Sequence, residues 1–168
     1  MTYPVKSVSN SIINQAFIHR QDLTHLKLQK LLYYVSGYYL ASKNESLIDY
    51  AFEAWDYGPV VPAIYHEFKK YGNAPIKLAS KFCLDSGAEI VIPPVTDDKL
   101  FDKVLSFVWE NYGKYSAEQL SQMTHELNTP WDITKKGNPG IKNADIPLCV
   151  LKEYFSRFVK QSSKKAGH

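Results

Sequence analysis

The chain has 168 residues, 45% of them hydrophobic, and a net charge of +3 at pH 7. A chain of this length can bury about two thirds of the surface of its unfolded form, so these totals predict one folded domain and exclude a disordered chain. Because no run of about 18 apolar residues occurs and the N-terminus lacks the pattern of a secretory signal, we expect a cytoplasmic protein without a membrane span.

The first part of the chain predicts two helices. Ser9 or Asn10 can cap a helix that ends near His19. Thr24 can cap a second helix that runs to about Ser42, in which apolar residues recur at helical spacing. The predicted core stripe of this second helix comprises Leu28, Leu31, Leu32, Val35, Tyr38 and Tyr39, and Tyr33 and Tyr34 lie toward its edges.

A strand-to-helix joint follows. Residues 50–56 predict a strand whose alternate side chains face opposite sides. Gly58 can adopt the backbone angles of a sharp turn, and Pro62 suits the first turn of the next helix. Residues 73–96 predict an irregular segment, within which a short strand at 88–92 can pair with residues 50–56.

Three further helices are predicted. Asp97 caps a helix that runs to about Tyr112, packed through regularly spaced apolar residues. Ser116 and Gln119 fit a capping box for a helix from 117 to about 127. The segment around Pro130 is expected to break that helix. Residues 134–144 are expected to form a loop, after which a last helix begins near Asp145 and Pro147.

These elements predict one domain over residues 1–160. Its fold class is α+β and predominantly α-helical, with about six helices in one core and a small two- or three-stranded β-sheet. Residues 161–168 are expected to form a disordered, polar basic tail. The excess of positive charge lies toward this end. Such an excess is typical of a solvated helix end, and the alternative is a basic arm that contacts phosphate.

Patterns of catalytic, metal or cofactor sites are not found in the sequence. The five histidines and two cysteines lack metal-ligand spacing, and Cys83 and Cys149 are expected to be reduced and partly buried. No Gly-x-Ser-x-Gly elbow or glycine-rich phosphate loop occurs. Ser116, His125 and Asp132 could be combined into a triad, but Ser116 is better explained as a helix cap. We therefore expect that the protein binds no cofactor and no metal and that it is not an enzyme.

Three blocks of residues carry a resemblance to a known family. The blocks are residues 26–34 with Leu-Gln-Lys-Leu-Leu-Tyr-Tyr, residues 52–65 with Ala-Trp-x-Tyr-Gly-Pro-Val, and residues 116–131 with Thr124, His125, Pro130 and Trp131. In this order they resemble the Panacea antitoxin domain family of phage-associated GepA-type and SocA-like antitoxins, over roughly residues 10–135.

The resemblance implies a function in a toxin–antitoxin system. The implied activity is neutralisation of a cognate toxin protein by direct, stoichiometric binding. An alternative is a proteolytic adaptor that delivers a partner to a Clp-type protease, and another is a phage-derived protein-interaction module. A homodimer remains open. Nucleic acid is not expected as a partner, because the predicted helix at 117–127 contains no Lys or Arg.

Aromatic residues are the expected partner contacts. Twelve tyrosines are more than one core of this size requires, and tyrosine and tryptophan anchor protein interfaces. The candidates for partner binding are Tyr33, Tyr34, Trp55, Tyr57 and Trp131, each with a core role as the alternative. The residues with an expected structural role are Gly58, Pro59, Pro62 and His125, the last of which would bind carbonyls at a helix C-terminus.

Overall fold

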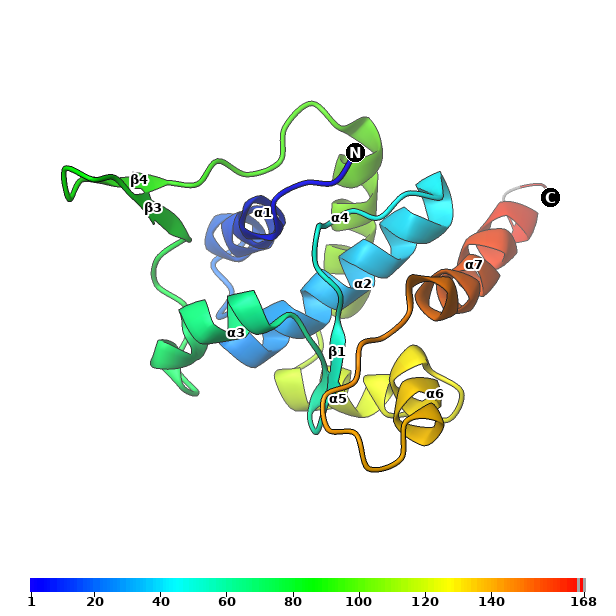
Figure 1. The fold of residues 1–168 in the computed structure, drawn as a ribbon. Helices are drawn as coiled ribbons and strands as arrows, with labels where there is room; N and C mark the ends of the chain where they lie inside the picture. Colours follow the sequence, from blue (N-terminus) through cyan, green and yellow to red (C-terminus); the bar gives the residue numbers. More distant parts are fainter. Residues whose placement is uncertain (166, 168) are drawn as a thin grey trace.

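The computed structural model describes residues 1–165 and residue 167, and it shows a helix-dominated α+β fold (Figure 1). The seven helices of this part of the chain are α1 (Val5–Ile18), α2 (His25–Lys43), α3 (Pro62–Phe68), α4 (Lys99–Tyr112), α5 (Ala117–Thr124), α6 (Pro130–Gly137) and α7 (Leu148–Lys165). A 3-10 turn at Lys69–Tyr71 extends α3. The predicted fold class is confirmed.

Helix α2 is the centre of the core. It packs against α1, α3, α4, α5 and α7, which surround it in Figure 1. Every residue from 28 to 40 is buried, so α2 has no solvent-facing stripe over this range. A helix enclosed on all sides in this way lies in the interior rather than on the surface. Tyr33 and Tyr34 are therefore core residues, with 1% and 5% of their surface exposed, and not edge residues as predicted.

Close packing brings α7 onto α2. Gly37 of α2 faces the ring of Phe155 from α7, and a Cβ atom at position 37 would overlap with that ring. Tyr33, Tyr34 and Tyr38 surround Phe155 with ring centroids 5.4, 6.0 and 5.0 Å away. The absence of a side chain at Gly37 thus lets one aromatic ring enter a cage of three tyrosines.

Two separate antiparallel hairpins replace the single predicted sheet. Strand β1 (Glu53–Trp55) pairs with β2 (Gly58–Val60), and β3 (Lys81–Cys83) pairs with β4 (Glu89–Val91). The predicted pairing of residues 88–92 with 50–56 is therefore wrong. Gly87, at φ +83°, helps to reverse the chain between β3 and β4, so each strand pairs with its nearest neighbour in the sequence.

Helix α6 replaces the first part of the loop predicted over residues 134–144. The predicted break around Pro130 is present, because α5 ends at Thr124 and a separate helix begins at Pro130. The Thr129 side chain caps α6 by accepting a hydrogen bond from the Asp132 amide at 3.3 Å. Pro130 occupies the first turn of the helix, where its missing N–H has no helical partner to lose. Thr-Pro is thus a helix start here.

Other helix limits also differ from those predicted. Helix α1 begins at Val5, with Pro4 at its N-cap, so Ser9 and Asn10 lie inside the helix and do not cap it. Helix α4 is capped by Asp98 rather than Asp97, because the Asp98 carboxylate accepts from the amides of Leu100 and Phe101. Helix α7 continues to Lys165, since no Gly or Pro interrupts it before Gly167. The tail predicted from residue 161 is helical to Lys165. Residues 166 and 168 lie outside the described part.

Candidate functional site

The three blocks singled out in the sequence meet at the turn between β1 and β2. Block one supplies Gln29 and Lys30 from α2, and block three supplies Ser121 and His125 from the α5 region and Trp131 from α6. Residues separated by more than 100 positions thus converge on one short hairpin. This convergence marks the hairpin as the candidate site.

Side chains of the surrounding helices bind four backbone carbonyls of this hairpin. Trp131 Nε1 donates to Trp55 O at 2.6 Å, His125 Nε2 to Asp56 O at 2.8 Å, Ser121 Oγ to Tyr57 O at 2.7 Å and Lys30 Nζ to Pro59 O at 3.0 Å. A two-stranded hairpin with strands of three residues is marginally stable alone. The helices therefore hold the turn in place.

Gln29 fixes the step from β2 into α3. Its side-chain amide donates to the Val61 carbonyl at 3.1 Å, and its Oε1 accepts from the Val61 amide at 2.9 Å. The buried amide therefore pairs with Val61 as a strand backbone would. Pro62 then begins α3 and occupies its first turn.

Lys30 is fully buried beneath the turn. Loss of solvation lowers the pKa of its ammonium to about 7, and among the described residues no Asp or Glu forms an ion pair with it. Gly58 lies directly above at φ +107°, where a Cβ atom would stand 2.9 Å from Lys30 Cε and 2.5 Å from Thr124 Oγ1. The predicted positive φ of Gly58 is confirmed, and close packing adds a second requirement for glycine.

His125 links α5 to the turn. Its Nδ1 lies 2.5 Å from the Ser121 carbonyl and its Nε2 lies 2.8 Å from the Asp56 carbonyl. The predicted contact with a carbonyl at the end of a helix is thus present, together with a contact that reaches the hairpin. The ring also packs edge-on against Trp131, with centroids 4.0 Å apart.

The aromatic candidates divide into three groups by exposure. Tyr57, at the tip of the turn, has 73% of its surface exposed. Trp55 is half-buried, with its ring 4.9 Å from Tyr65 and its Nε1 donating to Glu53 at 2.6 Å. Trp131 is half-buried, while Tyr33 and Tyr34 are in the core. Only the three residues at the hairpin can therefore reach a partner in this conformation.

A cavity of about 760 Å³ opens beside the hairpin. Its walls include His25, Gln29, Trp55, Tyr57, Tyr65 and Gln122. Burial, with a smaller effect of the Lys30 charge, lowers the pKa of His25. A hollow of this size, with aromatic walls and a few polar groups, is typical of a binding site.

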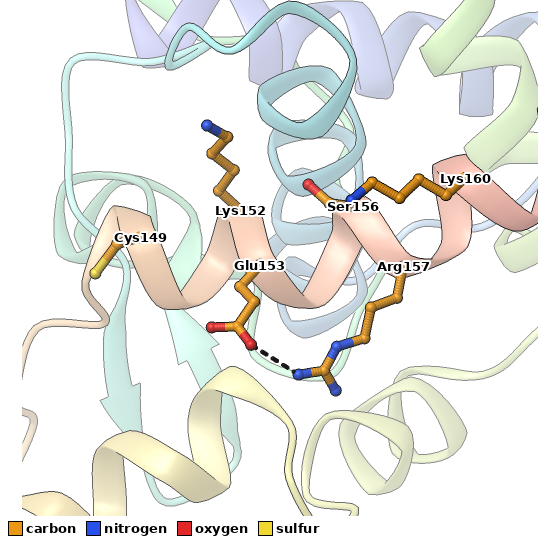
Figure 2. Close-up of a pocket in the computed structure, with 6 residues that line it drawn as sticks. All are labelled: Cys149, Lys152, Glu153, Ser156, Arg157 and Lys160. Carbon is orange, nitrogen blue, oxygen red and sulfur yellow. Dashed lines mark hydrogen bonds and ion pairs between the residues drawn. The ribbon is translucent and has the colours of Figure 1, made fainter.

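A second, open hollow of about 520 Å³ lies along α7 (Figure 2). It is lined by Cys149, Lys152, Glu153, Ser156, Arg157 and Lys160, all from one helix. Glu153 and Arg157 form an ion pair at 3.0 Å. Cys149 and Cys83 are exposed, contrary to the expected partial burial, because neither lies on the core face of its element.

Each member of the hypothetical triad has another role. Ser116 caps α5 by accepting from the Gln119 amide, and His125 binds two carbonyls. Asp132 accepts from Lys136 and from the Asn128 amide, and these two contacts, the first more than the second, lower the pKa of its carboxyl group. Among residues 1–165 and 167, no group of three or more His, Cys, Asp or Glu could hold a metal ion. No described helix is long and apolar enough to cross a membrane.

Sequence reasoning missed Gln29, Lys30 and Ser121 as parts of the site. The signal for the first two was available, because they interrupt an apolar run in a helix that is otherwise suited to a core. Buried Lys and Gln side chains are rare without a partner, so two such residues together indicate a polar contact inside the fold. Ser121 carried no comparable signal.

Comparisons with known proteins agree on one family. A family model described as "Antitoxin SocA-like, Panacea domain" matches residues 28–132, a range that includes the four side chains bound to backbone carbonyls of the β1–β2 hairpin. "Antitoxin SocA" of Caulobacter vibrioides (strain NA1000 / CB15N) is 33% identical over 162 residues, which cover 94% of this chain and 84% of that relative. No solved structure matches the chain.

Proposed function

The chain belongs to the family of SocA-like antitoxins with a Panacea domain, and from this membership we propose that it neutralises a cognate toxin protein in the cytoplasm by direct, stoichiometric binding. The observation that carries the proposal is the β1–β2 turn, where the exposed Tyr57 belongs to a backbone segment that four side chains hold by hydrogen bonds. A contact residue on a pre-ordered backbone loses little freedom on binding.

We propose that the toxin binds Tyr57, Trp55 and the adjoining cavity. Tyr57 offers a large exposed side chain, and tyrosine and tryptophan are enriched among the few residues that supply most of the binding energy of protein interfaces. Trp131 then has a supporting role, because its indole N–H is already bound to the Trp55 carbonyl. The cavity supplies a recess that a side chain of the toxin can enter.

The Tyr57→Ala variant tests this surface. Because Tyr57 is exposed, the variant should keep the melting temperature of the wild type and lose about 30-fold in toxin affinity, which corresponds to about 2 kcal/mol for an interface anchor. Tyr50→Ala is the matched control, since Tyr50 is also exposed, at 47%, but does not line the cavity. Unchanged toxin affinity in Tyr57→Ala, or an equal loss in both variants, would rule out this surface.

Dose experiments separate direct binding from the alternatives. With a candidate toxin taken from a gene next to that of the antitoxin, rescue of growth should require at least equimolar antitoxin and should persist in cells that lack Clp-type proteases. Rescue that disappears in those cells indicates a proteolytic adaptor. Rescue by far less than equimolar antitoxin, with covalently altered toxin, indicates an enzyme. Failure to bind any neighbouring toxin would favour a phage-derived interaction module for another target.

A further inference from the structure

The β3–β4 hairpin, residues 81–91, projects from the helical body beyond α1 and α3 (Figure 1). We call this segment the arm. The register of β3 with β4 places Phe82 opposite Ile90. Both side chains are more than half exposed, at 60% and 53%. Leu84 and Val91 add exposed apolar surface. The proposed contact around Tyr57 does not account for this apolar projection.

The base of the arm is firmly held although its strands are exposed. Asn10, buried in α1, donates to the carbonyls of Ser80 and Ile92 at 3.0 and 2.8 Å and accepts from the Ser80 amide at 2.8 Å. The Ile92 amide also donates to Ser80 O at 3.0 Å. A buried side chain that makes three hydrogen bonds to one base sets the direction of the arm relative to α1.

Strand β4 has an open hydrogen-bonding edge. The hydrogen bonds from Leu84 N to Ala88 O and from Ile92 N to Ser80 O show that the backbone groups of Ala88 and Ile92, on either side of β4, face β3. Because alternate residues of a strand face opposite edges, the N–H and C=O groups of Glu89 and Val91 point away from β3. All three residues of β4 are exposed, whereas Lys81 of β3 is partly covered. The free edge of β4 is thus the more accessible one.

The size of the arm decides between two occupants of this edge. Strands of three residues are about 10 Å long, so pairing between two copies of the arm would bury on the order of a few hundred Å². That is well below the roughly 1,200 Å² at the lower limit of stable interfaces. The arm therefore suits a partner that is also held elsewhere on the molecule, for which a second contact adds strongly to affinity.

We infer that an extended, apolar segment of the toxin adds to β4 as a third strand. This inference rests on the proposed function, because the Tyr57 surface supplies the first contact. Main-chain hydrogen bonds to Glu89 and Val91 hold the segment, and its alternate side chains cover Phe82 and Ile90. In the resulting three-stranded sheet, the N–H and C=O groups that the two-stranded hairpin leaves unpaired at this edge gain hydrogen-bond partners.

The test compares Val91→Pro with Val91→Ala. Both variants lose the side chain, but only proline removes the outward N–H, and it leaves the β3–β4 bonds intact. Affinity for the toxin of the neighbouring gene, measured by titration calorimetry, should fall about tenfold or more in Val91→Pro relative to Val91→Ala, since a buried acceptor loses its donor. In hydrogen exchange of the wild type, the amides of Glu89 and Val91 should become protected when toxin is added.

Other outcomes overturn the inference in distinguishable ways. If the wild type binds toxin but both amides stay unprotected and both Val91 variants bind equally, the arm proposal fails while the proposed function stands. If the amides become protected without toxin as the protein concentration rises, with a matching increase in mass by sedimentation, the arm pairs with a second copy. If the wild type binds no toxin, the proposed function fails and the arm proposal fails with it.

Discussion

Lys30 and Gly58 form a complementary pair at the scale of single residues. The Lys30 side chain fills the space below the turn that a Cβ atom at position 58 would need. Its ammonium donates to the Pro59 carbonyl. This ammonium has lost its hydration, and no carboxylate among the described residues pairs with it, so its burial costs free energy. The turn that presents Tyr57 therefore depends on a buried lysine and on a glycine with positive φ.

The first prediction concerns pH and Lys30. The folded chain releases the Lys30 proton near pH 7, whereas the unfolded chain holds it up to the ordinary lysine pKa of 10.5. The unfolded state thus binds more protons in this interval, so the Lys30 contribution to the free energy of unfolding rises as the pH increases from 7 to 10. Urea titrations across this range should show a smaller rise in Lys30→Met.

The readout for Lys30→Met is the slope of the free energy of unfolding against pH. The absolute free energy of unfolding is not suitable, because it also changes when the Pro59 carbonyl loses its donor. Lys77→Met, at an exposed lysine, is the control and should keep the slope of the wild type. Equal slopes in all three proteins would show that Lys30 remains charged in the folded state.

The second prediction concerns Gly58. Val is strained at φ +107°, and its Cβ would collide with Thr124 Oγ1, so Gly58→Val should lower the free energy of unfolding by more than about 1 kcal/mol. The control is Gly137→Ala, which has open space around its Cβ position and no positive φ. Thermal melting of the two variants measures the difference, and similar midpoints would contradict the strain at position 58.

At the scale of elements, the contact between α2 and α7 completes the core. Phe155 lies among Tyr33, Tyr34 and Tyr38, and Tyr34 also stacks on Tyr112 of α4 with ring centroids 4.0 Å apart. Three helices therefore meet through aromatic rings. This arrangement accounts for part of the high tyrosine content without any partner.

The third prediction tests this contact with Gly37→Ala. Alanine favours a helix over glycine by about 1 kcal/mol, yet the new methyl group would overlap with Phe155. We expect overpacking to prevail and the free energy of unfolding to fall by about 1–3 kcal/mol. In a double-mutant cycle with Phe155→Leu the cost of Gly37→Ala should shrink. Purely additive effects would contradict a direct clash.

At the scale of the whole molecule, the net excess of positive charge lies at one end. Residues 148–165 contain five of the 20 Lys and Arg and one of the 17 Asp and Glu, so they carry +4 while the rest of the chain carries −1. Helix α7 lies outside the residues matched by the family model. The residues that line the hollow along α7 include none of those that line the cavity beside Tyr57.

The fourth prediction is that truncation after Lys160 leaves the fold intact. Gln161, Lys164 and Lys165 are exposed, and changes at exposed positions usually alter stability by less than about 0.5 kcal/mol. The melting temperature should stay within about 2 °C of the wild type. A larger drop would mean that the end of α7 contributes to packing. A truncated protein that folds but fails to rescue growth would assign the basic end to partner binding.

Local signals in the sequence were sufficient for most helices. The cap at Thr24, the capping box of Ser116 with Gln119 and the start of α3 at Pro62 all occur as predicted, because a helix start depends on contacts within about four residues. The same reasoning identified the positive φ of Gly58. The order of the three blocks identified the family, which the comparisons confirm.

The tertiary structure alone decided which residues form the surface. Tyr33 and Tyr57 both belong to the blocks that resemble the family, yet one is buried and the other exposed, because burial depends on elements from distant parts of the chain. Helices α4 and α7 enclose α2, and the pairing of β4 with β3 leaves the arm exposed. The hydrogen bonds from Lys30, Ser121, His125 and Trp131 to one turn likewise arise only when α2, α5 and α6 pack together.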